Sequence, residues 1–275
     1  MKDTVTIIFS KNRGMQLDLL LKTLLLNCKD IQELSDINVL YTTNKEDHEK
    51  SYSTLKKEYK NINFVKEVSF KQDLLNLLKN RKNVLFLVDD SVVVKKFLLK
   101  EILFGLNSIH SALGFSLRLG KNTVNCYPFD KEQNVPLSVS NCKSEWTQYY
   151  WPDVELDFGY PLELSSSCYR VKDLLPLLEN CSFNNPNSLE SVMALNIEYY
   201  NEKPILLCFK NSVCFSDPLN KTQNFNNNRS GNISPEGLLL KFEEGYRINI
   251  EPFKGFISSG AHQYVPVEFI KVKDE

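Results

Sequence analysis

The sequence has 275 residues, of which 42% are hydrophobic and 24% are charged, fractions that are ordinary for a globular chain with a substantial core. The formal net charge of −1 provides no overall positive field, so nucleic acid is excluded as the expected partner. No apolar run approaches membrane-spanning length, and the opening MKDTVTIIFS is typical of a strand rather than a signal peptide, which predicts a cytoplasmic protein.

The seven cysteines are scattered along the chain and form no CxxC pair. This odd, dispersed set lacks the spacing of a zinc site or of a disulfide framework. Free structural thiols in a reducing compartment are therefore expected.

Strand and helix patterns alternate from the N-terminus to the middle of the chain. The expected strands are Val5–Phe9, Ile37–Tyr41, Asn63–Val68 and Val84–Val88, and the expected helices are Met15–Asn27, Asp47–Tyr59 and Gln72–Leu78. Such alternation predicts an α/β fold with a parallel, doubly wound sheet.

The stretch NVLFLVDDS places two adjacent carboxylates, Asp89 and Asp90, directly after a buried-strand pattern. Adjacent acids at such a position repel each other unless a cation lies between them. A divalent metal that carries phosphate is the expected cation, because hard cations prefer carboxylate and phosphate oxygens. The plain alternative is a solvated acidic turn.

In parallel sheets of this kind, ligands bind beyond the carboxyl ends of the strands. That rule brings three polar turns to one crevice: Ser10–Arg13, Thr42–Asn44 and Asp89–Ser91. Lys11 and Arg13 supply positive charge where a nucleoside diphosphate would need it. The sequence contains no GxGxxG and no P-loop lysine motif, which argues against a dinucleotide-binding protein or an ATPase.

The rest of the chain is less regular. Its expected elements are helices over Phe97–Ile109 and Val171–Glu179, a helix from near Leu189 towards Tyr200 with Ser188 as its cap, and strands over Leu113–Leu119, Lys203–Phe209 and Ser212–Phe215. Residues 217–235, which include Arg229, are expected to form a mobile loop over the site. The change from regular alternation to less regular segments divides the chain into two parts, 1–119 and 120–275.

Taken together, these segments resemble GT-A glycosyltransferases, in particular bacterial enzymes of the family-two-like kind. The resemblance rests on the strand that ends in VDDS, and on DFGYPLELSSSCYR, NNPNSLE, NNRSGNISPE and AHQYVP. VDDS lacks the second acid of a strict D-x-D metal motif. The resemblance implies a Rossmann-like GT-A fold, with a mostly parallel central sheet flanked by helices and a C-terminal acceptor-binding part. It also implies one continuous domain, in which 1–119 is the nucleotide-sugar-binding half and 120–275 is the acceptor-binding and catalytic half.

The resemblance also implies roles for individual residues. Asp90 would bind Mn²⁺ or Mg²⁺, with His262 as a late further ligand, and Asp89 would approach the ribose or a metal-bound water. The donor nucleotide would be contacted by Ser10, Lys11, Arg13, Asn44, Lys71 and Arg118. Arg118 could equally be a buried ion-pair partner.

The function expected on this basis is metal-dependent transfer of a sugar from a nucleoside diphosphate sugar, UDP-linked, to a saccharide or lipid-linked acceptor. An inverting reaction in surface polysaccharide synthesis is expected, with peripheral contact at the inner face of the membrane. Glu190 is chosen as the general base and Asp157 as an acceptor ligand, over Asp153. Their plain alternatives are a first-turn helix acid for Glu190 and turn residues for the two aspartates. A nucleotidyltransferase and a non-catalytic nucleotide-sugar-binding module are the alternative functions.

Overall fold

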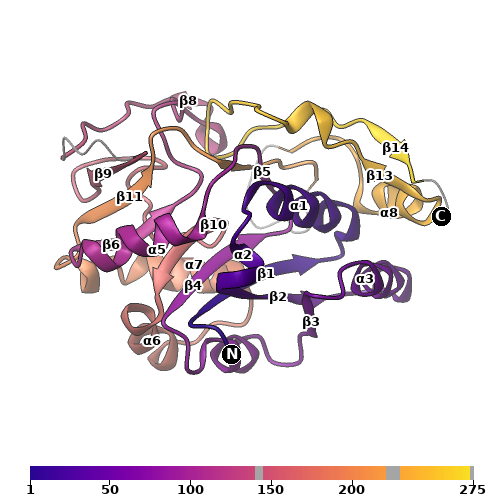
Figure 1. The fold of residues 1–275 in the computed structure, drawn as a ribbon, viewed down its shortest axis with the longest axis horizontal. Coiled ribbons are helices and arrows are strands. Elements are labelled where there is room, and N and C mark those ends of the chain that lie inside the picture. Colours follow the sequence, from indigo (N-terminus) through magenta and orange to yellow (C-terminus); the bar gives the residue numbers. More distant parts are fainter. Residues whose placement is uncertain (140–144, 221–229, 273–275) are drawn as a thin grey trace.

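Eight strands form the central sheet of the computed structural model, which describes residues 1–139, 145–220 and 230–272 (Figure 1). Their order across the sheet is β3-β2-β1-β4-β10-β6-β11-β9. The strands are β1 (Thr4–Lys11), β2 (Ser35–Thr42), β3 (Asn63–Lys66), β4 (Asn83–Val88), β6 (Ala112–Ser116), β9 (Trp146–Tyr150), β10 (Ser166–Arg170) and β11 (Ile205–Phe209).

One half of the sheet is parallel and the other is mixed. β3, β2, β1 and β4 all run in the same direction. β10 then runs antiparallel between β4 and β6, β11 is parallel to β6, and β9 is antiparallel to β11. The expected α/β class, with a mostly parallel central sheet flanked by helices, is confirmed.

Helices cover both faces of the sheet (Figure 1). Along β4, Leu85 and Leu87 point into one core, which also holds the buried side chains of helices α1 (Gly14–Asn27) and α5 (Leu99–Ser108). Val84 and Phe86 point into a second core, with the buried side chains of α4 (Phe70–Leu78) and α6 (Val171–Asn180). This alternation explains the continuous apolar run of β4, because both of its faces are buried. The helices are α1 (Gly14–Asn27), α2 (Ile31–Leu34), α3 (Glu46–Glu58), α4 (Phe70–Leu78), α5 (Leu99–Ser108), α6 (Val171–Asn180), α7 (Pro186–Leu195) and α8 (Pro235–Glu243), with 3₁₀ turns at Tyr127–Phe129, Ile197–Tyr200 and Glu251–Phe253.

Three two-stranded sheets complete the fold. β5 (Ser91–Val93) pairs with β12 (Cys214–Ser216), β7 (Asn125–Cys126) with β8 (Lys131–Glu132), and β13 (Tyr246–Ile248) with β14 (Phe269–Lys271). The β5–β12 pair matters for the site, because β5 follows the acid pair directly and brings a distant segment beside it.

Two expected elements need correction. The strand expected over Leu113–Leu119 ends at Ser116, so Arg118 lies just beyond β6 rather than on it. The helix expected from near Leu189 to Tyr200 begins at Pro186 and ends at Leu195, because Asn185, not Ser188, is its cap. Of the expected mobile loop, residues 221–229, which include Arg229, lie outside the described ranges, whereas Asp217 and Asn220 are buried and α8 begins at Pro235.

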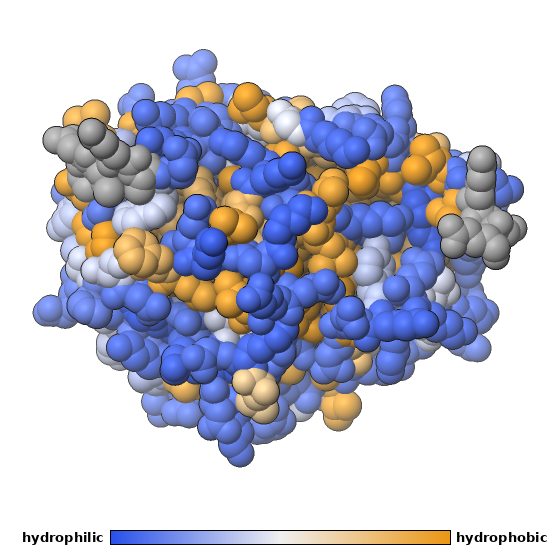
Figure 2. Space-filling view, in the orientation of Figure 1, coloured by the Kyte–Doolittle hydropathy of each residue, from blue (hydrophilic) through white to orange (hydrophobic). Residues whose placement is uncertain are grey.

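Free thiols are confirmed for every cysteine that the structure describes, whereas Cys142 falls outside those ranges. Figure 2 shows a largely hydrophilic face with apolar side chains gathered across its middle. Within the described ranges, no helix is both long enough and apolar enough to cross a membrane.

Candidate active site

The carboxyl ends of β1, β2 and β4 meet at one edge of the sheet. Lys11 ends β1 opposite Thr42, which ends β2. The Asn44 N–H donates to Asn12 Oδ1 at 3.0 Å, and the Lys11 N–H donates to Asp89 Oδ2 at 3.1 Å. The three polar turns expected to share a crevice are therefore in contact, with the side chains of Lys11 and Asn44 exposed to solvent.

The guanidinium group of Arg13 lies between the two adjacent acids. One of its terminal nitrogens is 3.0 Å from Asp89 Oδ1 and 3.0 Å from Asp90 Oδ2. Its Nε and its other terminal nitrogen donate to the side-chain and backbone oxygens of Asn220, at 3.0 and 2.6 Å. The cation expected between the acids is thus supplied, in the protein alone, by an arginine rather than by a metal.

Asp89 is held by protein donors at both of its carboxylate oxygens. Besides Arg13, it accepts hydrogen bonds from the Ser10 hydroxyl at 2.9 Å and from the Lys11 N–H. The Ser10 hydroxyl also lies 2.6 Å from the buried Tyr52 hydroxyl. Asp89 therefore fixes the turn after β1, and its expected approach to a ribose stays a prediction.

Asp90 is less completely satisfied and faces a third acid, Asp217. Burial raises the pKa of Asp90 to about 6, against the opposing charge of Arg13. In the β5–β12 ladder Ser216 pairs with Ser91, and the Asp217 N–H donates to the Asp90 carbonyl at 2.8 Å. Asp217 and Asp90 are thus cross-strand neighbours.

Asp217 was not among the residues expected at the site. Its Oδ1 accepts the Val265 N–H at 3.2 Å, whereas its Oδ2 is buried without a hydrogen-bond partner. Burial raises its pKa to about 8, the Val265 N–H opposes this, and the charge of Asp90 adds to it. The sequence signal was an acid directly after an apolar strand, as in β4, but it stood at the start of a segment interpreted as loop.

The residues around Asp90 fit a divalent cation only in part. Asp90 Oδ1 is not used by Arg13. Among the described residues, neither Asp217 Oδ2 nor the buried Nδ1 of His262, whose residue bridges to Ser216, has a hydrogen-bond partner. Carboxylate oxygens suit Mg²⁺ and Mn²⁺, and an imidazole nitrogen is a common further ligand. Within the described ranges, no three such side chains are already grouped as a metal site. Phosphate oxygens of a ligand would have to complete it.

Arg118 lies beyond β6 at the same edge, since the N–H of the preceding Leu117 donates to the Ser166 carbonyl. It is only 4% exposed, and its Nε is 3.7 Å from Glu163 Oε1 without forming a hydrogen bond. Burial lowers its pKa, but the surrounding carboxylates, led by Glu163 and followed by Asp157 and Glu190, raise it above its ordinary value. The structure therefore brings the two predicted catalytic acids to one buried arginine.

Glu163, which was also not expected, is the innermost acid of this group. Four donors from the run of serines that follows it satisfy its carboxylate: the Ser165 N–H and hydroxyl, the Ser166 N–H and the Ser167 hydroxyl. These four hydrogen bonds fix the position of the Glu163 carboxylate beside Arg118.

Glu190 lies in the second turn of α7. The segment Leu164–Ser165 connects it to Ser91, the residue after the acid pair. Glu190 Oε1 accepts the Leu164 N–H at 3.1 Å, and the next residue, Ser165, accepts a hydrogen bond from the Ser91 hydroxyl at 2.6 Å. Burial, then the charge of Glu163, raises the pKa of Glu190 to about 7, with Arg118 opposing. A carboxyl group with this pKa can accept a proton near neutral pH.

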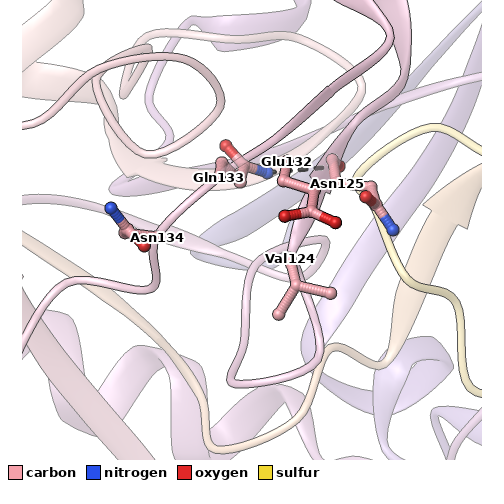
Figure 3. A pocket seen from close by; sticks show the side chains of 5 residues that line it. All are labelled: Val124, Asn125, Glu132, Gln133 and Asn134. Atoms are coloured by element: carbon pink, nitrogen blue, oxygen red, sulfur yellow. Dashed lines mark hydrogen bonds between the residues drawn. The ribbon is translucent and has the colours of Figure 1, made fainter.

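Asp157 connects this group to a pocket of about 560 Å³ (Figure 3). The buried Gln133 donates to Asp157 Oδ2 at 2.8 Å and accepts the Asp157 N–H at 3.2 Å. The pocket is lined by Val124, Asn125, Glu132, Gln133 and Asn134. A second pocket lies around Lys2 and Arg81, and its lining includes none of the predicted site residues.

The Lys71 ammonium is held by protein groups, and its expected contact with the donor nucleotide stays a prediction. It donates to the Glu179 and Cys181 carbonyls at 2.8 and 2.7 Å and lies over the Phe183 ring. These carbonyls belong to the last turn of α6 and the residue after it, where a cation is favoured.

No known family model matches this chain. The bifunctional glycosyltransferase pgtA of Dictyostelium discoideum is 29% identical over 228 residues, which span 74% of this chain but only 30% of that protein. The chain resembles a glycosyltransferase in sequence. The expected resemblance to glycosyltransferases is confirmed by this relative, of whose length this chain spans less than a third.

Solved structures with a similar arrangement of elements include other glycosyltransferases. Staphylococcus aureus TarS superposes with a TM-score of 0.49 at 15% identity, over 76% of this chain and 35% of that one. GalNAc-T7, solved with UDP, GalNAc and Mn²⁺, gives 0.45 at 9% identity over 76% and 43%. The mannosyltransferase PcManGT of Pyrobaculum calidifontis, solved with GDP-Man and Mn²⁺, gives 0.40 at 8% identity over 70% and 52%.

Proposed function

We propose that this chain transfers a sugar from a nucleoside diphosphate sugar to a hydroxyl of a saccharide or lipid-linked acceptor. The proposed donor nucleotide is UDP, and the proposed pathway is surface polysaccharide synthesis. The observation that carries the proposal is the position of the half-buried Glu190 carboxyl, which accepts the Leu164 N–H in the segment that also contacts Ser91, the residue after the acid pair. Its raised pKa, caused first by burial, is consistent with a base. The similarity to a glycosyltransferase supports it. The expected setting is cytoplasmic, at the inner face of the membrane.

The donor is proposed to bind across the turns after β1, β2 and β4. Arg13, already fixed over the acid pair, and the exposed Lys11 supply positive charge for the diphosphate. Ser10 and Asn44 lie on the turns that would flank the nucleoside. Asp90, with Asp217 and His262, would hold Mn²⁺ or Mg²⁺, and a bound cation supplies charge that stabilises the leaving diphosphate.

Glu190 is proposed as the general base of an inverting displacement. The acceptor oxygen forms a bond to the anomeric carbon, the bond from that carbon to the diphosphate breaks, and the acceptor proton passes to the Glu190 carboxylate. The nucleoside diphosphate leaves with the bond electrons. Arg118 and Glu163 are proposed to hold Glu190 in place and to set its pKa.

Replacement of Glu190 by Gln tests this role. We expect Glu190→Gln to lower kcat by about 10²–10⁴-fold, the range for loss of a general base. The wild-type rate should fall as the pH drops below about 7, because protonated Glu190 cannot accept the acceptor proton. UDP affinity, measured by calorimetry, should not change.

Glu198→Gln is the matched control, because Glu198 is an exposed acid in the 3₁₀ turn that follows α7. Loss of UDP binding in Glu190→Gln would assign the residue to the donor site instead. Release of pyrophosphate from a nucleoside triphosphate and a sugar phosphate would identify a nucleotidyltransferase. UDP-sugar binding without turnover of any donor would identify a non-catalytic module.

A further inference from the structure

The pocket beside Asp157 contains polar side chains that the protein itself does not use. In the β7–β8 pair, Asn125 is directly opposite Glu132, so their side chains project from the same face. Among the described residues, neither side chain takes part in a hydrogen bond or ion pair, and the same holds for Asn134. Figure 3 shows the Glu132 carboxylate and the Asn134 amide on the lining of this pocket.

The floor of the pocket is rigid and leads to the proposed base. Gln133 is 8% exposed and is held at both ends of its amide, by Asp157 and by the Asn125 carbonyl at 3.2 Å. A ligand that contacts Gln133 would therefore be separated from Asp157 by one side chain. Asp157 and Glu190, the proposed base, both act on Arg118.

The charge of the lining restricts what can bind. Glu132 is the charged member of the lining, Asp157 lies behind Gln133, and the lining contains no lysine or arginine. An anionic ligand would meet negative charge without a compensating cation. Amides that donate and accept, and a carboxylate that accepts from hydroxyls, instead match a neutral ligand rich in hydroxyl groups.

We propose that the pocket lined by Val124, Asn125, Glu132, Gln133 and Asn134 is the acceptor site, and that it binds a neutral saccharide. The proposal rests on the transferase function above and adds the chemical class of the acceptor. The volume of about 560 Å³ is within the range of small-molecule sites and accommodates a short saccharide.

Saccharide binding to the full chain tests the proposal without requiring turnover. The probes are the neutral disaccharides lactose, maltose, cellobiose and diacetylchitobiose, with sialyllactose as an anionic probe, followed by saturation-transfer NMR and titration. We expect a neutral probe to bind, and Glu132→Ala and Asn134→Ala each to weaken it by about tenfold, roughly the loss of one hydrogen bond to a charged or polar group. Glu132 and Asn134 are exposed, so both variants should fold.

Glu202→Ala, which removes an exposed glutamate elsewhere, is the matched control and should bind like the wild type. Preference for sialyllactose, binding that Glu132→Ala leaves unchanged, or failure of every neutral probe to bind would each overturn the proposal. Titration with UDP distinguishes failure of the pocket proposal from failure of the proposed transferase function. Saccharide binding without UDP binding would contradict the donor site alone, and UDP binding without saccharide binding would contradict the pocket alone.

Discussion

Asp89 and Asp90 are adjacent in the chain but have different environments. Asp89 is satisfied by three protein donors and stabilises the turn after β1, whereas Asp90 shares one donor and has a raised pKa. Asp90 is therefore the acid with capacity left for a ligand, as the sequence predicted for the metal. The sequence predicted that the turn with Arg13 would meet the acids, but not that its guanidinium would lie between them, because that placement also depends on Asn220, 207 positions along the chain.

Asp217 should make stability depend on pH in the absence of divalent metal. Its folded pKa of about 8 exceeds its ordinary 3.8, so between these values the folded protein holds a proton that the unfolded chain has released. The free energy of unfolding should therefore fall as the pH rises through this window. Asp217→Asn, which cannot titrate, should remove about 3 kcal/mol of the decrease between pH 5 and 7, which is two pH units at roughly 1.4 kcal/mol each.

Urea unfolding at the two pH values, with a chelator present, measures this effect. Asp153→Asn is the control, because Asp153 is exposed and precedes the site in an irregular segment. An unchanged pH dependence in Asp217→Asn would mean that the folded protein does not hold this proton.

At the scale of single elements, α7 determines where Glu190 lies. Asn185 accepts the Ser188 N–H at 2.9 Å, and the Ser188 hydroxyl accepts the Asn185 N–H at 3.1 Å, which together form a capping box. The run NNPNS offers more than one capping residue, so the sequence predicted the helix but started it about one turn late. Glu190 is consequently in the second turn, and the helix dipole is a weaker explanation for an acid there.

Removal of this cap should destabilise the protein modestly and locally. Asn185→Ala should lower the free energy of unfolding by about 1 kcal/mol, because the helix loses a partner for one of its free N–H groups. Thermal unfolding measures the loss. Asn187→Ala, within the first turn of α7 and without a side-chain hydrogen bond among the described residues, should have a much smaller effect. Equal losses in the two variants would contradict the capping role.

The sequence predicted the elements of the parallel half closely, because β1, β2 and β4 each contain an apolar run and are bounded by polar turns. It did not predict which neighbour β10 would pair with. Hydrophobic pattern defines that a strand is buried, whereas its partner depends on residues far along the chain, here Leu87 for Ser166. The same limit hid Glu163 and Asp217, whose roles depend on contacts with residues that are distant in sequence.

At the scale of the whole molecule, the proposed donor site depends on both parts of the chain. Arg13 and Asp90 come from the first part, and Asn220, Asp217 and His262 come from the second. Binding of a donor across them should therefore stabilise the folded protein as a whole.

UDP with Mn²⁺ should raise the melting temperature more than UDP alone. At a ligand concentration about 100 times the Kd, the stabilisation is about 2.7 kcal/mol. Asp90→Asn should remove the part that requires Mn²⁺, because it replaces a carboxylate ligand by a neutral amide. Differential scanning fluorimetry with and without Mn²⁺ measures both effects. Full Mn²⁺-dependent stabilisation of Asp90→Asn would argue against Asp90 as the metal ligand.

The position of β10 also determines the order in which the sheet can be completed. β4 and β6 lie on either side of β10, so their facing edges remain without backbone partners until residue 170 has been synthesised. A nascent chain that ends at residue 119 would expose one edge of β4 and both edges of β6, because β10 and β11 come later, and such unpaired edges are templates for aggregation. We therefore expect the two parts of the chain to fold as one cooperative unit during synthesis, and a gene split between them to yield insoluble fragments.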